Sequence, residues 1–170
     1  MFPLNHATTA GLNDVSDRST IATREVSTHR LDDVLPMGPV DLLKLDVQGA
    51  ELMVLRGAER TLTSTAVVHC EAMFSPMYLG QPLFGDIQKH LLEKGFQLID
   101  VLIPHRHHYL TPSGRMTQDR LLWADAVFIH ETEDTETLYI QALIAAGMYR
   151  KPTLAEHLMV QAESGAPLQL

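Results

Sequence analysis

Short runs of apolar residues alternate along the chain with segments in which apolar residues recur every three or four positions. The short runs have the length and β-branched content of buried strands, and they span residues 41–47, 66–72, 96–103 and 121–129. The periodic segments predict helices, at residues 50–62, 83–94, 135–146 and 152–163. Because predicted strands and helices alternate, the pattern predicts an α/β domain with a mostly parallel sheet.

The ends of the chain show neither pattern. Residues 1–20 are rich in Thr, Asn, Asp and Ser and predict an irregular N-terminal arm. Residues 164–170 predict a flexible tail. Between the arm and the first apolar run, residues 21–30 interleave β-branched and polar side chains and predict a strand, and residues 31–35 predict a short helical turn. A length of 170 residues fits one domain, which we place at residues 21–163.

Composition and charge exclude several classes of function. The formal net charge of −8 argues against a nucleic-acid partner, because neutralising phosphates requires clustered Lys and Arg. The single cysteine, Cys70, excludes an intramolecular disulfide and a multi-cysteine zinc site. No apolar run approaches the length of a membrane span, and residues 1–11 lack the basic start and apolar stretch of a signal peptide. We therefore expect a cytoplasmic protein that binds neither nucleic acid nor a membrane.

Two predicted strands end in acidic residues, Asp46 and Glu71. A single predicted helix joins these strands, which favours neighbouring positions in the sheet, and ligands of such sheets bind at the carboxyl ends of the strands. Two carboxylates placed there could accept a proton from a substrate hydroxyl, hold a cation or accept hydrogen bonds from a ligand. The alternative is that one or both accept hydrogen bonds from backbone N–H groups and shape the turn into the next helix.

The turn after the first of these strands has the sequence QGAE, at residues 48–51. Gly49 permits a backbone conformation that other residues avoid, or lets a ligand approach the backbone closely. The helix that begins after it offers free N–H groups at the positive end of its dipole. A short turn with one glycine is as consistent with a purely structural role of the turn as with ligand binding.

Other reactive side chains carry weaker predictions. Residues 105–109 (HRHHY) suggest a metal site, but adjacent histidines do not converge easily on one ion, so we expect a solvated loop and no metal. Tyr78, His69 and Cys70 could line a pocket, although a cysteine is commonly a buried core residue. Trp123 begins an apolar strand and is expected in the core. The chain contains no GxGxxG, GxxxxGK[ST], HExxH or GxSxG motif, and hence no dinucleotide fingerprint, P-loop, zincin site or hydrolase elbow.

Several sequence blocks, in the same order, resemble the FkbM-type methyltransferase family. The most specific block is LKLDVQGAE at residues 43–51. The further blocks are RLDDVL, VLRGA, VHCE, GF and DAVF, at residues 30–35, 54–58, 68–71, 95–96 and 125–128. With Tyr78 they extend the resemblance from about residue 26 to residue 160.

The resemblance implies a class I, Rossmann-like methyltransferase fold that uses S-adenosylmethionine, with a mostly parallel sheet, an antiparallel last strand and helices on both faces. It implies O-methylation of a small-molecule acceptor, at a hydroxyl of a sugar or secondary metabolite. Asp46 is the leading candidate for the base or for the residue that orients the acceptor, and Glu71 is the second. Tyr78 is the candidate substrate contact. The candidate cofactor-binding residues are Asp46, Gln48, Gly49 and Glu51.

The resemblance is incomplete on its amino-terminal side. The family's glycine-rich turn after the first strand and the acid after the second, which hold the methionine and ribose moieties of the cofactor, have no counterpart here. The family's strand order is 3-2-1-4-5-7-6, so residues 41–47 are expected at an open sheet edge. We expect such a chain to bind the cofactor too weakly to measure, and to be inactive alone. The alternative is a non-catalytic α/β association module that binds a partner chain or a second copy through this edge.

Overall fold

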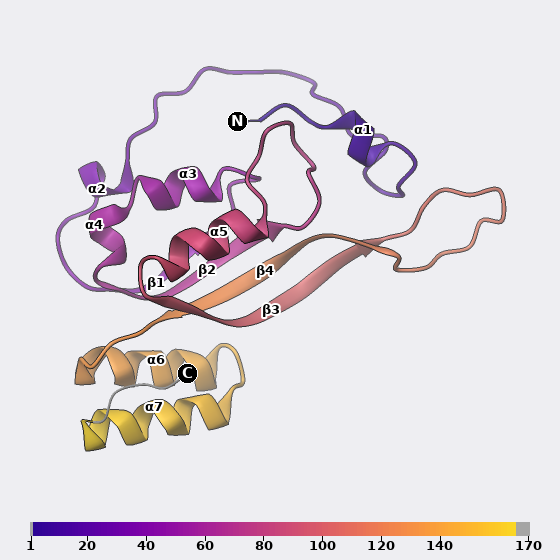
Figure 1. The fold of residues 1–170 in the computed structure, drawn as a ribbon. Coiled ribbons are helices and arrows are strands. Elements are labelled where there is room, and N and C mark those ends of the chain that lie inside the picture. The colour runs from indigo at the N-terminus through magenta and orange to yellow at the C-terminus, as the bar shows by residue number, and fades with distance from the viewer. Residues whose placement is uncertain (1, 166–170) are drawn as a thin grey trace.

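Helices cover both faces of one four-stranded sheet in this computed structural model, which describes residues 2–165 (Figure 1). The strands are β1 (Val40–Leu45), β2 (Thr65–Met73), β3 (Phe96–His107) and β4 (Arg120–His130). The helices are α1 (His6–Thr9), α2 (Leu31–Val34), α3 (Glu51–Arg56), α4 (Glu59–Leu62), α5 (Phe84–Leu92), α6 (Thr135–Gly147) and α7 (Pro152–Ser164). The predicted α/β class is confirmed, and residues 166–170 of the predicted tail lie outside the described residues.

The sheet has the strand order β1-β2-β4-β3. β1 and β2 are parallel neighbours, as predicted from their single connecting segment, but β4 pairs antiparallel with both β2 and β3. The expectation of a mostly parallel sheet is therefore wrong, since only one of the three strand pairs is parallel. The physical reason is the direct return from β3 to β4 through residues 108–119, because a connection without a crossover pairs strands antiparallel. The order itself matches the one that the family resemblance implies for its last four strands, with β1 at an edge.

β3 continues beyond Ile103, where the sequence predicts its end. The pairing with β4 shifts register between Leu102 and His105, and Ile103 has a φ of 47°. Pro104 thus lies at an irregularity of an edge strand. Proline has no backbone N–H, but at this position no regular hydrogen bond between β3 and β4 is lost. The prediction of a solvated loop from His105 onward is wrong for residues 105–107, which belong to the strand.

Two other predicted elements differ from the structure. Residues 21–30 form no strand and are exposed throughout, because no neighbouring strand satisfies their backbone groups. The helix predicted at residues 50–62 is divided into α3 and α4 at Gly57 and Ala58. A side chain at Gly57 would place its Cβ 3.3 Å from the Val54 carbonyl oxygen, so the close packing at this break favours glycine.

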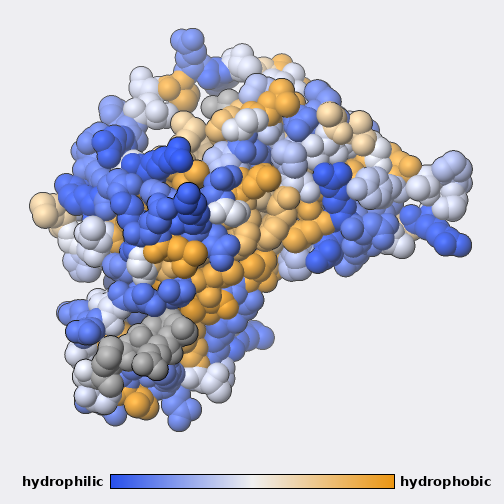
Figure 2. All heavy atoms as spheres, viewed as in Figure 1, coloured by the Kyte–Doolittle hydropathy of each residue, from blue (hydrophilic) through white to orange (hydrophobic). Residues whose placement is uncertain are grey.

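The core is divided by the sheet because successive residues of a strand point to opposite faces. Val68, Cys70 and Ala72 of β2 pack under α3, α4 and α5, whereas Val67 packs under α6 and α7. Figure 2 shows hydrophobic residues across the middle of the molecule, in the band between the two helix layers of Figure 1. No helix within residues 2–165 combines the length and the apolar character that crossing a membrane requires.

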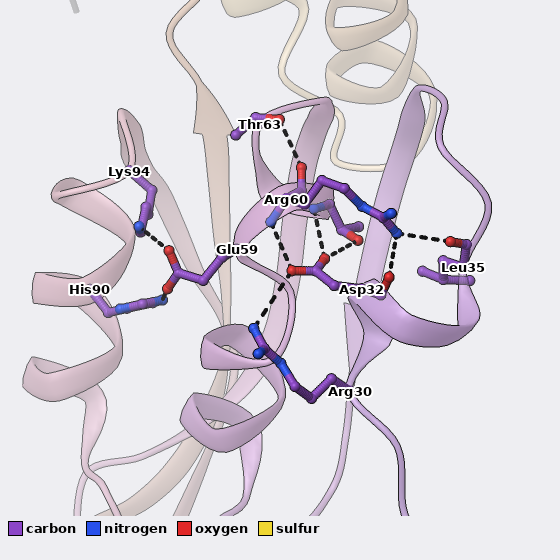
Figure 3. A network of polar contacts seen from close by, with 9 residues as sticks. Arg30, Asp32, Leu35, Glu59, Arg60, Thr63, His90 and Lys94 are labelled. Carbon is purple, nitrogen blue, oxygen red and sulfur yellow. Dashed lines mark hydrogen bonds and ion pairs between the residues drawn. The ribbon is translucent and has the colours of Figure 1, made fainter.

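Polar contacts fix α2 and α5 against α4 (Figure 3). The Asp32 carboxylate accepts hydrogen bonds from the backbone N–H groups of Arg60 and Thr61, each at 2.9 Å, at the start of α4. Glu59 of the same helix pairs with Lys94, just after α5, and lies 3.8 Å from His90 Nε2. These contacts hold together the segments that precede β1, β2 and β3.

The N-terminal segment packs over the far end of β2 and β4. Leu12 and Val15 have no exposed surface, and they contact Met73, Met77 and Leu122. Isolated bridges pair Leu4 with Tyr78 and Leu12 with Tyr109. The segment is irregular apart from α1, as its composition predicts, and it carries Arg18 to the carboxyl ends of β1 and β2.

Candidate active site

The turn after β1 has an unusual backbone that places Gln48 at the edge of the sheet. Gln48 and Gly49 have φ angles of 52° and 93°, both in the left-handed region. A Cβ at position 49 would lie 3.2 Å from Tyr78 Cδ2, so glycine is required both by conformation and by the close approach of Tyr78. The Val47 N–H donates to Glu51 Oε1 at 2.8 Å. Glu51 is 1% exposed, and this hydrogen bond links the two ends of the turn.

Gln48 joins the two acidic residues that sequence analysis singled out. Its Nε2 donates to Asp46 Oδ1 and to Glu71 Oε2, each at 3.0 Å. Its Oε1 accepts a hydrogen bond of 3.1 Å from the Tyr78 hydroxyl. Asp46, Gln48, Glu71 and Tyr78 therefore form one hydrogen-bonded group across the ends of β1 and β2 and the loop before α5.

The environments of the two carboxylates differ. Asp46 is exposed, whereas Glu71 is 9% exposed and lies on β2. Burial, and then the negative charges of Asp46, Glu51 and Asp125, raises the pKa of Glu71 to about 7. A carboxyl group with this pKa exchanges a proton near neutral pH, as a general acid or base does.

A cavity of about 140 Å³ opens in front of Glu71. Its lining residues are Arg18, Gln48, Glu71, Met73, Met77, Tyr78 and Trp123. Pockets that enclose drug-sized ligands usually measure about 300–1,000 Å³. At about 140 Å³ the cavity is smaller than such pockets and encloses a small group rather than a drug-sized molecule.

A second polar row lies beside Glu71 on the same face of the sheet. Asp125 of β4 is directly opposite Glu71 in the register, and it contacts Lys44 Nζ at 3.2 Å and His69 Nε2 at 3.4 Å. His69 Nδ1 is 2.9 Å from the Tyr149 hydroxyl. Burial and the nearby Lys44 lower the pKa of His69. The Asp125 carboxylate therefore lies close to Glu71, and the positive charge of Lys44 partly compensates the negative charge of Asp125.

The other candidates from the sequence have different surroundings. Cys70 is fully buried on the opposite face of β2, and burial raises the pKa of its thiol to about 12, so it does not reach the cavity. His105 stacks on Trp123 with ring centroids 4.7 Å apart, and His107, 7% exposed, donates from Nδ1 to the Asn13 carbonyl oxygen at 3.0 Å. Across residues 2–165, no group of three or more His, Cys, Asp or Glu side chains is arranged to hold a metal ion.

Sequence reasoning missed two residues that line the cavity. Trp123 was expected in the core because it begins an apolar strand, but it is only partly buried and faces the cavity. Arg18 comes from an irregular segment whose composition carries no signal for a binding residue. The packing of Leu12 and Val15, together with the bridges of Leu4 to Tyr78 and of Leu12 to Tyr109, brings this segment to the site.

Comparison with known proteins identifies the family. The model of the methyltransferase FkbM domain matches residues 2–98, which include the whole Asp46–Tyr78 group. Over 59 residues the chain is 41% identical to the 2-O-methyltransferase NoeI of Sinorhizobium fredii, an alignment that covers 33% of this chain and 24% of that protein. The chain thus spans about a quarter of the length of this curated relative. No solved structure matches the chain. Because the family model covers more than half of its residues, the chain belongs to the FkbM methyltransferase domain family.

Proposed function

We propose that this chain forms the acceptor side of a methyltransferase site that O-methylates a hydroxyl of a small molecule, a sugar or a secondary metabolite. Membership of the FkbM family supports methyl transfer. The name of the similar Sinorhizobium protein, a 2-O-methyltransferase, supports oxygen as the atom that receives the methyl group. The cavity supports a small acceptor because it accommodates a group the size of one ring.

The observation that carries the proposal is the buried Glu71 carboxylate in the cavity wall, with a pKa of about 7. Glu71 accepts the proton of the acceptor hydroxyl as the oxygen attacks the methyl group. Gln48 fixes the orientation of this carboxylate through its amide. Asp46, which shares that amide, raises the proton affinity of Glu71 by its charge. Glu71 is therefore the first candidate for the base, ahead of the exposed Asp46.

S-adenosylmethionine, the methyl donor that the family implies, supplies a sulfonium methyl group that is already electrophilic. The chain's own contribution is the position of the acceptor, and alignment of two reactants can lower a barrier by about 7–11 kcal/mol. Tyr78 and Gln48 orient the acceptor through the hydroxyl and amide at the cavity wall. Of the four candidate cofactor residues, Glu51 is 1% exposed and accepts from the Val47 N–H, so its role is to keep the turn that presents Gln48. Direct contact of Asp46, Gln48 and Gly49 with the cofactor is part of the proposal.

The size of the cavity gives a further expectation for the cofactor. We expect the isolated chain to bind S-adenosylmethionine more weakly than the micromolar range, because the cavity does not enclose the whole molecule. Isothermal titration measures this directly. A micromolar dissociation constant would contradict the assignment of the cavity to the acceptor side.

The role of Glu71 is tested by methyl transfer at millimolar S-adenosylmethionine, which compensates for weak binding. The assay follows labelled methyl groups into a panel of sugar and polyol acceptors. Glu71→Gln should reduce the rate by about 10²–10⁴-fold, the usual contribution of a general base. Glu133→Gln, at an exposed site away from the cavity, is the matched control and should not change the rate. Methyl transfer that is measurable in wild type and equally fast in Glu71→Gln would refute the proposal.

A second candidate function rests on the open edge of β1. In the described part of the chain no strand pairs with the outer side of Val40–Leu45. An unpaired edge is a template for another strand, so the chain could associate with a partner or with itself. Sedimentation at several concentrations tests this alternative. A monomer at every concentration would exclude self-association.

A further inference from the structure

Basic side chains gather around Trp123, which lines the cavity together with Arg18, although the protein carries a net charge of −8. The Arg18 guanidinium carbon lies 5.6 Å from the centre of the Trp123 ring. The rings of His105 and His107 lie 4.7 Å and 5.3 Å from the same tryptophan. Arg120 donates to the hydroxyl groups of Ser75 and Tyr109 close by.

Arg18 differs from the lysines near the sheet that are paired with acids, because its guanidinium has no acidic partner within residues 2–165. Lys44, Lys94 and Lys151 each pair with a carboxylate. Within residues 2–165, the Arg18 guanidinium forms neither a hydrogen bond nor an ion pair, and its contact is with the face of Trp123. Its hydrogen-bond donors are therefore available to a ligand in the cavity.

The cavity has two chemically different ends. Gln48, Glu71 and Tyr78 form a hydrogen-bonding end that suits a hydroxyl group. Arg18, on the Trp123 side, forms a cationic end. Building on the proposed function, we propose that the methyl acceptor carries an anionic group, a carboxylate or a phosphate or sulfate ester, which Arg18 binds while the hydroxyl lies at Glu71.

The physical basis is the geometry of the guanidinium group. It presents paired N–H donors that match a carboxylate or a phosphate, and these charge-assisted bonds are about twice as strong as neutral ones. The Trp123 face attracts the guanidinium before the ligand arrives, which reduces the loss of side-chain freedom on binding. A neutral group gains none of this at Arg18, and a cationic group is repelled by Arg18.

The single tryptophan of the chain, Trp123, makes the binding measurable without catalysis. Its fluorescence is followed while the 170-residue chain is titrated with glucuronate, glucose 6-phosphate, glucose and glucosamine. We expect one of the two anionic sugars to bind at least about tenfold more tightly than glucose, a difference of about 1.4 kcal/mol. Comparison of the two anionic probes distinguishes a carboxylate from a phosphate ester.

Variants assign the preference to Arg18. Arg18→Gln should weaken binding of the preferred anionic sugar about tenfold and leave glucose unchanged, and Arg18→Lys should retain part of the preference. Arg24→Gln removes an equal charge from an exposed residue outside the cavity and should have no effect. Equal affinities for glucose and both anionic sugars, no fluorescence response to either anion, or equal losses in the Arg18→Gln and Arg24→Gln variants would each overturn the proposal.

This test is independent of the one for the proposed function. Loss of the anion preference in Arg18→Gln, together with unchanged methyl transfer in Glu71→Gln, supports the anionic-ligand site and refutes only the role of Glu71. An anion preference that Arg18→Gln leaves unchanged, together with slower methyl transfer in Glu71→Gln, supports the role of Glu71 and refutes the anionic acceptor.

Discussion

Gln48 is the residue on which the geometry of the site depends. Its amide group uses both of its functions: the nitrogen donates to Asp46 and Glu71, and the oxygen accepts from Tyr78. A neutral amide between two carboxylates separates like charges that would repel each other in direct contact. The left-handed backbone conformation at Gln48 and Gly49 places the Gln48 side chain between Asp46, Glu71 and Tyr78.

Gly49→Ala should destabilise the protein by about 1–3 kcal/mol, because alanine is strained at a φ of 93° and its Cβ would crowd Tyr78 at 3.2 Å. Gly80→Ala is the matched control, since Gly80 has a φ of 76° but no neighbour within 4 Å of the added Cβ. Urea denaturation should therefore show a larger loss at position 49 than at position 80. Equal losses would mean that the contact with Tyr78 contributes nothing.

Glu71 should make the stability of the protein depend on pH. Its pKa is about 7 in the folded protein and about 4.5 in the unfolded chain, so between these values the folded state binds a proton that the unfolded state releases. The free energy of unfolding therefore falls as the pH rises through this window, by at most about 3 kcal/mol. Glu71→Gln lacks this dependence.

The comparison of wild type and Glu71→Gln by urea denaturation at pH 5 and pH 8 isolates this effect, because other groups titrate equally in both proteins. Relative to wild type, the variant should gain stability between the two pH values. A constant difference would show that Glu71 titrates normally.

Among the elements, α4 depends on a cap supplied from another helix. Its own N-cap residue, Ala58, offers no side-chain hydrogen bond, and Asp32 of α2 accepts from the N–H groups of Arg60 and Thr61 instead. Burial alone would raise the pKa of Asp32, but these hydrogen bonds outweigh it and lower the pKa.

Asp32→Ala should reduce the free energy of unfolding by about 1–2 kcal/mol, as loss of an N-cap does. Asp33→Ala, at the exposed neighbouring position of α2, should change it by less than about 0.5 kcal/mol. Thermal or urea denaturation of the two variants measures the difference. A similar loss in both would indicate a general effect of charge in α2.

The elements that sequence analysis predicted well are those whose signals are local. Gly95 after α5 and Pro152 at the start of α7 mark the ends of their helices, and the apolar run of residues 121–129 needs no partner to be recognised as a strand. The errors arise where a contact with a residue distant in the sequence determines the secondary structure. Residues 21–30 have a strand-like pattern without a neighbouring strand, and β3 passes Pro104 because β4 supports it on one side only.

At the scale of the whole molecule, the site is assembled from segments far apart in the sequence. The proximity of Asp46 and Glu71 was predictable because Asp46 follows β1 and Glu71 lies near the carboxyl end of the neighbouring parallel strand β2. Arg18 and Trp123 were not, because their approach depends on how the N-terminal segment packs over β2 and β4. The antiparallel direction of β4, which the family resemblance implied, follows from the direct return of residues 108–119 from β3 and not from the local pattern of β4.

The central claim is that Asp46 and Glu71 share one partly buried site in which Glu71 holds a proton near neutral pH. Site-resolved ¹³C NMR of the Glu71 side-chain carboxyl, recorded against pH, measures this most directly. The account predicts a midpoint near 7, which moves toward 4.5 when Asp46→Asn removes the neighbouring charge. A midpoint of about 4.5 in wild type, unchanged by Asp46→Asn, would contradict it.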